Sequence, residues 1–101
     1  MAEQGEEVGR RDTLARYQVT ILPDAFRQLD RLPTSVKKNV AARIEDLGRD
    51  RHPQQAKPLK GEKGLWRLRV GDYRVLYRIQ DELRLVLVLE MGNRKDVYRG
   101  R

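Results

Sequence analysis

Residues 65–79 read LWRLRVGDYRVLYRI, and this stretch decides the fold. It holds two runs in which apolar and polar residues alternate, joined by Gly71-Asp72, a pair suited to a tight primed turn. The pattern predicts a β-hairpin with a two-residue turn. Its expected cross-strand pairs are Val70 with Tyr73, Arg69 with Arg74, and Leu68 with Val75.

The predicted hairpin has two unlike faces. The apolar face, fit for a core, carries Trp66, Leu68, Val70, Tyr73, Val75, Tyr77 and Ile79. The other face carries Arg67, Arg69, Arg74 and Arg78, with Leu65 and Leu76 among them. Like charges that lie opposite each other across strands destabilise a sheet by about 0.2–1 kcal/mol per pair. A face that accepts this repulsion is expected to bind an anion.

Length and charge fit a single basic domain. The chain has 101 residues, 37% of them charged and 39% apolar, with a net charge of +7. Residues 49–78 hold nine basic and three acidic residues, a surplus of six positive charges beside the predicted hairpin. This uneven distribution favours a polyanionic partner or an acidic protein partner over a soluble protein with evenly spread charge.

The inventory of reactive residues is narrow. There is no cysteine, which excludes disulfides, thiolate metal sites and cysteine nucleophiles. The one histidine, His52, precedes a proline in an expected loop, so serine–histidine catalysis and histidine metal sites are poorly supported. No stretch resembles a signal peptide or a membrane span, and we expect a cytoplasmic protein without membrane contact.

The N-terminal half predicts a tail, a strand and two helices. Residues 1–15 lack periodicity and are expected to be a flexible tail, which leaves residues 16–101 as one domain. Residues 17–21 alternate as a strand. The first helix should begin with Asp24 as N-cap and end before Pro33, with its apolar positions at Phe26, Leu29 and Leu32.

A second helix is predicted from Thr34 or Ser35 to a C-terminal cap at Gly48. Its buried stripe is expected to be Val36, Val40, Ile44 and Leu47. The two helices would form an antiparallel αα-hairpin. Residues 52–64 are expected to be a connector that carries Lys57, Lys60 and Lys63.

Residues 84–91 predict a last strand that is apolar on both faces and therefore covered on both. In a simple register Val86 and Val88 join the core face. Leu85, Leu87 and Leu89 join the arginine side, where the C-terminal segment or a partner protein must shield them. The expected fold class is α+β, in the order β-α-α-β-β-β, with an antiparallel sheet and the αα-hairpin packed on one face.

The available chemistry is that of arginine and tyrosine. Arginine binds phosphate with two hydrogen bonds and stabilises a charged phosphoryl transition state, and tyrosine stacks on bases or exchanges a proton if nearby cations lower its pKa. Glu90 and Asp96, two acids near the basic strands in sequence, are interpreted as balancing charge. These groups suffice for RNA cleavage by its own 2′-hydroxyl, without metal or cofactor. A merely solvated basic face is the alternative.

The strand and helix order, together with four short segments, resembles the RelE/ParE superfamily of toxins from type II toxin–antitoxin systems. The resemblance spans about residues 17–99. The supporting segments are Leu59-Lys60-Gly61, Trp66-Arg67-Leu68-Arg69, Gly71-Asp72-Tyr73-Arg74-Val75-Leu76-Tyr77, and Gly92-Asn93-Arg94 followed by Val97-Tyr98. The resemblance implies a RelE-like microbial RNase fold and a ribosome-dependent messenger RNA endoribonuclease that inhibits translation.

By the same resemblance, Arg67 and Arg69 would stabilise the transition state and Arg74 would hold the scissile phosphate. Arg94 would aid the leaving 5′-oxygen, and Tyr98 would stack on a base or orient the attacking hydroxyl. The residues expected to guide RNA are Lys57, Lys60, Lys63, Arg78 and Lys95.

The chain departs from well-known RelE members at two positions, where Arg67 and Arg69 stand in place of lysine. Lysine can lose its proton among other cations, whereas arginine keeps it. A general-base role at these positions is therefore not expected, and electrostatic stabilisation remains. The base would then be Tyr98 or no protein group.

The resemblance also implies partners: a cognate RelB-like antitoxin in a hetero-oligomer, messenger RNA in the ribosomal decoding site, and ribosomal RNA. Two alternatives stay open. One is a ParE-like inhibitor of DNA gyrase, which shares the fold and generally lacks the arginine–tyrosine set. The other is a basic RNA-binding module without catalysis.

Overall fold

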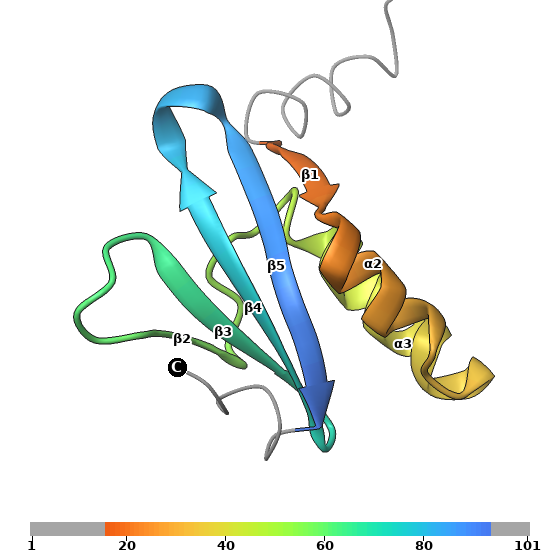
Figure 1. Cartoon of the computed structure of the whole chain (residues 1–101). Helices are drawn as coiled ribbons and strands as arrows, with labels where there is room; N and C mark the ends of the chain where they lie inside the picture. The colour runs from red at the N-terminus through yellow and green to blue at the C-terminus, as the bar shows by residue number, and fades with distance from the viewer. Residues whose placement is uncertain (1–15, 94–101) are drawn as a thin grey trace, which may run out of the picture.

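The computed structural model describes residues 16–93, which form two helices beside one five-stranded sheet (Figure 1). The predicted flexible tail, residues 1–15, lies outside the described residues. The elements are β1 (Gln18–Ile21), α2 (Pro23–Asp30), α3 (Thr34–Asp46), β2 (Ala56–Pro58), β3 (Leu65–Val70), β4 (Tyr73–Gln80), the 3-10 turn η1 (Asp81–Leu83) and β5 (Leu85–Asn93). The α+β class and the packing of both helices on one side of the sheet are confirmed.

The strands lie in the order β1-β5-β4-β3-β2, and the sheet is mixed. β1 runs parallel to β5, with Gln18 opposite Leu85 and Ile21 opposite Val88, while every other neighbouring pair is antiparallel. The prediction of a wholly antiparallel sheet was therefore wrong for one pair. Alternation reports which face a side chain occupies, but it carries no information on strand direction.

A fifth strand lies within the predicted connector. β2 pairs antiparallel with β3, and Lys57 lies opposite Arg67. The strand is three residues long, too short for alternation to be recognised, and it ends in Pro58 at the sheet edge, where a missing N–H is tolerated.

The predicted hairpin is confirmed in its register, with Val70 opposite Tyr73, Arg69 opposite Arg74 and Leu68 opposite Val75. Gly71 has a φ of 60°, the positive value that the tight turn requires of its first central residue.

The first helix starts earlier than predicted. Pro23 occupies the first helical turn and Leu22 the N-cap, without a side-chain hydrogen bond, so Asp24 lies inside the first turn and is not the cap. Proline suits this place because its fixed φ is helical and its missing N–H would have no partner there. The buried residues are Ala25 and Leu29, whereas the side chain of Phe26 is 58% exposed.

The second helix agrees with its predicted bounds and stripe: Val40, Ile44 and Leu47 are buried and Val36 packs against them. Its predicted cap was wrong, since Leu47 occupies the C-cap position. Gly48 serves a different purpose. A Cβ at this position would lie 2.9 Å from the Tyr17 carbonyl oxygen, because the Tyr17 N–H donates to the Gly48 carbonyl at 2.7 Å.

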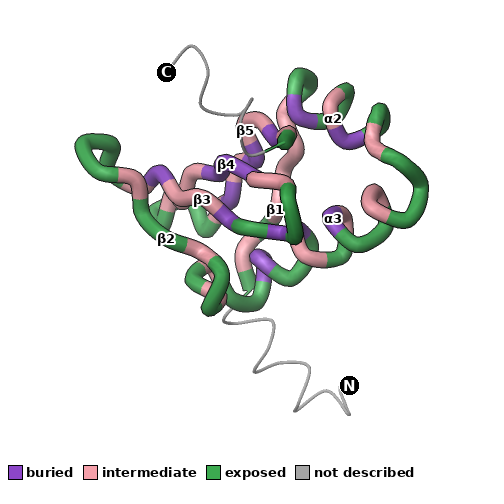
Figure 2. The backbone as a smooth tube through the Cα atoms, turned by 90° about the horizontal axis from the view of Figure 1, so that it is seen from below, coloured by how far each residue is buried: buried purple, intermediate pink, exposed green. Residues whose placement is uncertain are grey.

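The core lies between the helices and one sheet face, as the buried positions in Figure 2 illustrate. Leu68, Val75, Tyr77, Val86 and Val88 are completely buried there against the helical stripe. Trp66 and Ile79 pack against this cluster, as expected from their places on the predicted apolar face of the hairpin. The opposite sheet face is left free of the helices. Neither helix of the described chain is long and apolar enough to cross a membrane.

Candidate nucleic-acid interface

The sheet face turned away from the helices carries Arg67, Arg69, Arg74 and Arg78, and we call it the arginine face. The register aligns its residues in rows across the strands. One row runs Lys57, Arg67, Leu76 and Glu90; the next runs Arg69, Arg74 and Gly92; a third joins Leu65, Arg78 and Leu87. Cβ atoms directly opposite each other are about 4.5–5.5 Å apart. The fold therefore brings the hairpin arginines and Lys57 onto one continuous surface.

Arg74 lies at the centre of this face, and its guanidinium group does not use all of its hydrogen-bond donors. Its Nε and Nη1 atoms are buried, and neither has a hydrogen-bond partner. A buried N–H without a partner costs about 1–3 kcal/mol, and more for a charged group. Guanidinium N–H groups are strong donors to the oxygens of a phosphate. Arg74 therefore keeps donor capacity that an anion reaching this face could use.

Arg67 and Arg69 flank Arg74 on the neighbouring strand. Arg69 lies directly opposite Arg74 and is exposed, whereas Arg67 is half-buried one row away and has a buried Nε. Leu76, opposite Arg67, is completely buried. The apolar neighbour lowers the local dielectric, which strengthens the attraction between these guanidinium groups and an anion.

The predicted RNA-guiding lysines lie at one side of the arginine face. Lys57 is exposed on β2, and Lys60 and Lys63 are exposed in the loop between β2 and β3. They extend the positive surface beyond the hairpin. Exposed ammonium groups of this kind contact a nucleic-acid backbone without reading its sequence.

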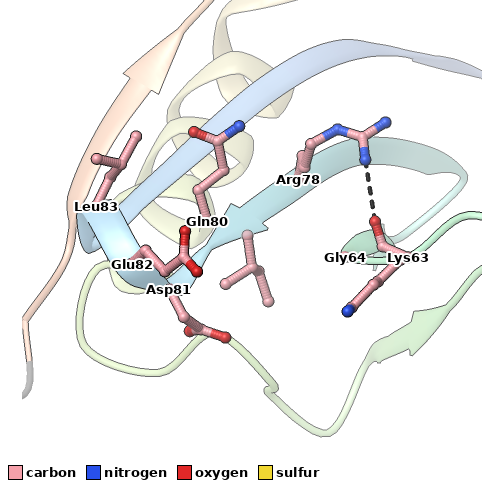
Figure 3. A pocket seen from close by; sticks show the side chains of 8 residues that line it. Lys63, Gly64, Arg78, Gln80, Asp81, Glu82 and Leu83 are labelled. Atoms are coloured by element: carbon pink, nitrogen blue, oxygen red, sulfur yellow. Dashed lines mark hydrogen bonds between the residues drawn. The ribbon is translucent and has the colours of Figure 1, made fainter.

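Arg78 has a structural task that the sequence did not reveal. Its Nη1 donates to the Lys63 carbonyl at 3.0 Å, and its Nη2 lies 3.6 Å from Glu62 Oε1. Figure 3 shows this bond beside an open pocket of about 650 Å³ between the β2–β3 loop and η1. Asp81 and Glu82 also line this pocket. Arg78 anchors the loop, and the nearby acids make this end of the sheet less suited to RNA.

A β-bulge alters β5 opposite the junction of Leu76 and Tyr77. Val88 pairs with Tyr77 and Glu90 pairs with Leu76, so Leu89 between them has no partner in the ladder. The simple register predicted for this strand is therefore wrong beyond Val88. Met91 enters the core, being 3% exposed, while Glu90 joins the arginine face, where strict alternation would have directed it into the core.

The bulged end of β5 is held by a helix. The Met91 N–H donates to Gln28 Oε1 at 2.7 Å, from a point of β5 that lies beyond the last residue of β1. Gln28 on α2 thus takes the place that a neighbouring strand would fill. Sequence reasoning missed both Gln28 and the position of Glu90, because neither a bulge nor a helix–strand bond leaves a periodic signal.

Two tyrosines of the described chain are unsuited to proton exchange. Burial, and then the charge of Asp50, raises the pKa of Tyr77, whose hydroxyl donates to the Arg51 carbonyl at 2.6 Å. The hydrogen bond to Asp81, and then burial, raises the pKa of Tyr17. Both shifts are opposite to the lowering that a general base needs.

Three predicted site residues, Arg94, Lys95 and Tyr98, lie outside the described residues. Within residues 16–93, no three histidine or acidic side chains gather in a way that could hold a metal ion. The arginines of the described arginine face can interact electrostatically with an anion.

The pair of helices and the five-stranded mixed sheet match the fold of solved RelE structures. The model of the family "ParE toxin of type II toxin-antitoxin system, parDE" matches residues 19–98. The chain belongs to this family, within the RelE/ParE superfamily, as the sequence resemblance predicted, and it is a type II toxin of a RelBE-like system.

Curated relatives agree. Toxin RelG of Mycobacterium tuberculosis is 39% identical over 88 residues, covering 82% of this chain and 97% of RelG. Toxin RelE of the same organism is 38% identical, covering 82% of this chain and 87% of that toxin. The crystal structure of the M. tuberculosis toxin–antitoxin complex RelBE2 contains a chain with a TM-score of 0.71 and 36% identity, covering 84% of this chain and 99% of that one.

Proposed function

We propose that this toxin is a ribosome-dependent messenger RNA endoribonuclease that works without a metal and acts in the cytoplasm, where its ribosomes are. The observation that carries the proposal is Arg74, whose two buried N–H groups lack partners at the centre of a basic face. A phosphate diester supplies acceptor oxygens for such donors.

The reaction needs little beyond charge and geometry. The 2′-hydroxyl of one nucleotide loses its proton and its oxygen forms a bond to the adjacent phosphorus, while the bond to the 5′-oxygen breaks. The leaving 5′-oxygen gains a proton, with water carrying the proton between the two, so the products are a 2′,3′-cyclic phosphate and a 5′-hydroxyl. Arg74 holds the phosphate, and Arg67 and Arg69 stabilise the added negative charge. Arg94, the next residue after the end of β5, stabilises the leaving oxygen, and Tyr98 orients the attacking hydroxyl.

RNA reaches this face along a basic track. Lys57, Lys60 and Lys63 continue the positive surface from the hairpin to the β2–β3 loop, and they contact the backbone of the messenger or of ribosomal RNA. Arg78 has a lesser part here, since its guanidinium is bonded to the loop.

A cognate RelB-like antitoxin would form a hetero-oligomer with the toxin and inhibit it. Leu85, Leu87 and Leu89 are half-buried on β5, and the arginine face beside them is positively charged. An acidic amphipathic segment would cover the leucines and neutralise the arginines. The M. tuberculosis relative of known structure is itself part of a toxin–antitoxin complex.

The test adds the purified full-length protein to programmed ribosomes and maps new 5′ ends by primer extension. We expect cleavage of the messenger, and a loss of about 100-fold or more in its rate for Arg74→Ala. Tyr98→Phe should reduce cleavage more than it reduces RNA binding. Lys38→Ala, which removes one exposed charge from the helical layer, is the matched control and should cut normally.

An absence of new 5′ ends, beside an active control toxin, would contradict the proposal. The match to the ParE family then favours the second candidate, a ParE-like inhibitor of DNA gyrase. Inhibition of supercoiling with unaffected translation would support that activity. Tight ribosome binding with neither effect would indicate an RNA-binding module without catalysis.

A further inference from the structure

The end of β5 borders the arginine that is proposed to hold the phosphate. Gly92 lies directly opposite Arg74, and Asn93, the last residue of the strand, lies opposite Tyr73. The chain continues from Asn93 to Arg94, the residue proposed to stabilise the leaving oxygen. The placement of this strand end therefore affects how the proposed catalytic groups are arranged.

This end has less strand pairing than the rest of β5. β1 pairs with β5 only as far as Ile21 opposite Val88, so residues 89–93 have β4 as their one neighbouring strand within the described chain. The bulge also leaves Leu89 without a partner in the ladder. A strand end with one neighbour and an interrupted ladder opens more readily than the interior of a sheet.

Gln28 supplies a contact to this strand end from α2. Its Oε1 accepts a hydrogen bond from the Met91 N–H at 2.7 Å, at a point of β5 beyond the last residue of β1. The helix is itself fixed, because Ala25 and Leu29 are buried in the core. The bond therefore joins a well-packed helix to the strand end beside Arg74.

A bond at this place acts on the geometry of the site. Gln28 belongs to the helical layer, on the other side of the sheet from the arginine face, so it acts through the strand and not by contact with RNA (Figure 1). Catalytic groups must be held to within about 0.5 Å, and a displacement of about 1 Å can cost 100-fold in rate. Movement of the β5 end changes the separation between Arg74 and the residues that follow β5.

We propose that Gln28 is a positioning residue for RNA cleavage, which holds the end of β5 against β4 and thereby sets the point from which the chain continues to Arg94. The inference rests on the endoribonuclease function proposed above. It gives a helix on the far side of the sheet a measurable part in the rate of cleavage.

The experiment measures the cleavage rate of full-length toxin against the concentration of programmed ribosomes, which separates kcat from KM. Gln28→Leu removes the acceptor and keeps the side-chain size, and we expect kcat to fall about tenfold. KM should stay within about twofold of the wild-type value, since the arginines and lysines assigned to RNA binding are unchanged. Gln28→Glu, which retains an acceptor oxygen, should recover most of the lost rate.

Tyr77→Phe is the matched control, because it removes another partly buried hydrogen bond between a side chain and a backbone group. The Tyr77 hydroxyl donates to the Arg51 carbonyl at 2.6 Å, in the loop that follows α3. Both variants should lose similar stability in urea, and only Gln28→Leu should lose kcat.

A double-mutant cycle separates positioning from a general loss of stability. In the Arg94→Ala background, Gln28→Leu should slow cleavage less than about twofold, because the group that it positions is already absent. In the Lys57→Gln background the loss of about tenfold should persist, since Lys57 lies on β2 at the far edge of the sheet.

Three outcomes would overturn the inference and leave the proposed function intact. They are a wild-type kcat in Gln28→Leu, equal losses of kcat in Gln28→Leu and Tyr77→Phe, and an undiminished effect of Gln28→Leu in the Arg94→Ala background. Failure of Gln28→Glu to recover the rate would also count against the acceptor and overturn it. A wild type that cuts no messenger overturns the proposed function, and this inference with it.

Discussion

At the scale of single residues, Arg74 and Arg78 illustrate how the same side chain serves two purposes on one sheet face. Arg78 uses its guanidinium within the protein, with the Lys63 carbonyl and Glu62 as partners. Arg74 leaves two buried nitrogens without partners. Such an unsatisfied group lowers stability, and proteins retain it where a ligand completes the bonding.

The contrast predicts opposite effects of one substitution. Arg74→Met keeps the side-chain stem and removes the unsatisfied nitrogens, so the free energy of unfolding should rise by about 1 kcal/mol while cleavage is lost. Arg78→Met should lower it by about 0.5–1 kcal/mol, because a hydrogen bond and an ion pair disappear. Urea denaturation of the three proteins measures both. A destabilised Arg74→Met would mean that Arg74 has a structural task in the free toxin.

The alternation in the sequence suffices to place the hairpin arginines on one face, because a period of two is a property of the strand itself. It does not distinguish Arg74 from Arg78, since the partners of Arg78 lie in a loop whose path is set by tertiary structure. The same limit explains Asp24. Its residue type favoured an N-cap, but the fixed φ of Pro23 moved the start of the helix.

At the scale of elements, the end of β5 has support from two sides. β4 pairs with it up to Asn93, and Gln28 of α2 accepts its Met91 N–H where β1 has ended. Helix and bulge together determine which side chains of β5 reach the arginine face. Packing of α2 is thereby coupled to the surface on the other side of the sheet.

This coupling is testable with Gln28→Leu, which retains the side-chain size but removes the acceptor. The free energy of unfolding should fall by about 1–2 kcal/mol, since the Met91 N–H is left without a partner. The Met91 amide should lose hydrogen-exchange protection, while amides in the hairpin keep theirs. Phe26→Leu, at an exposed position of the same helix, is the control. Unchanged protection at Met91 would show that Gln28 does not hold the strand.

Element identity was predictable where a pattern is long enough. The stripe of α3 repeats through four residues, and the hairpin alternates over fifteen. β2 has only three residues, and the bulge adds a single residue, Leu89, to β5, so neither generates a periodic signal in the sequence. The parallel β1–β5 pair depends on how the helices return the chain, which local sequence does not encode.

At the scale of the whole molecule, charge is divided between two layers. Residues 23–46, the helical layer, hold five basic and four acidic residues, with ion pairs between Arg27 and Asp24 and between Lys37 and Asp30. Residues 49–78 hold six more basic than acidic residues. The molecule therefore has one nearly neutral side and one strongly positive side, which orients it toward a polyanion.

Salt should reveal this division. The affinity for a labelled single-stranded RNA should fall linearly on a double-logarithmic plot against salt concentration. Lys57→Gln/Lys60→Gln should reduce the magnitude of the slope by about 1.4, or about 0.7 for each lost contact. Arg31→Gln/Lys38→Gln, which removes two exposed charges from the helical layer, should leave the slope unchanged. Fluorescence anisotropy measures all three proteins, and equal slopes would contradict a one-sided RNA surface.

The order of the strands has a consequence for synthesis. β5 is the last strand of the described chain, yet it lies between β1 and β4, and Gln18 must find Leu85 across most of the sequence. A nascent chain that lacks β5 is missing two of the four strand interfaces, so β1 cannot join the β4-β3-β2 part of the sheet. The sheet, and with it the fold of the toxin, is therefore completed only after β5 has been translated.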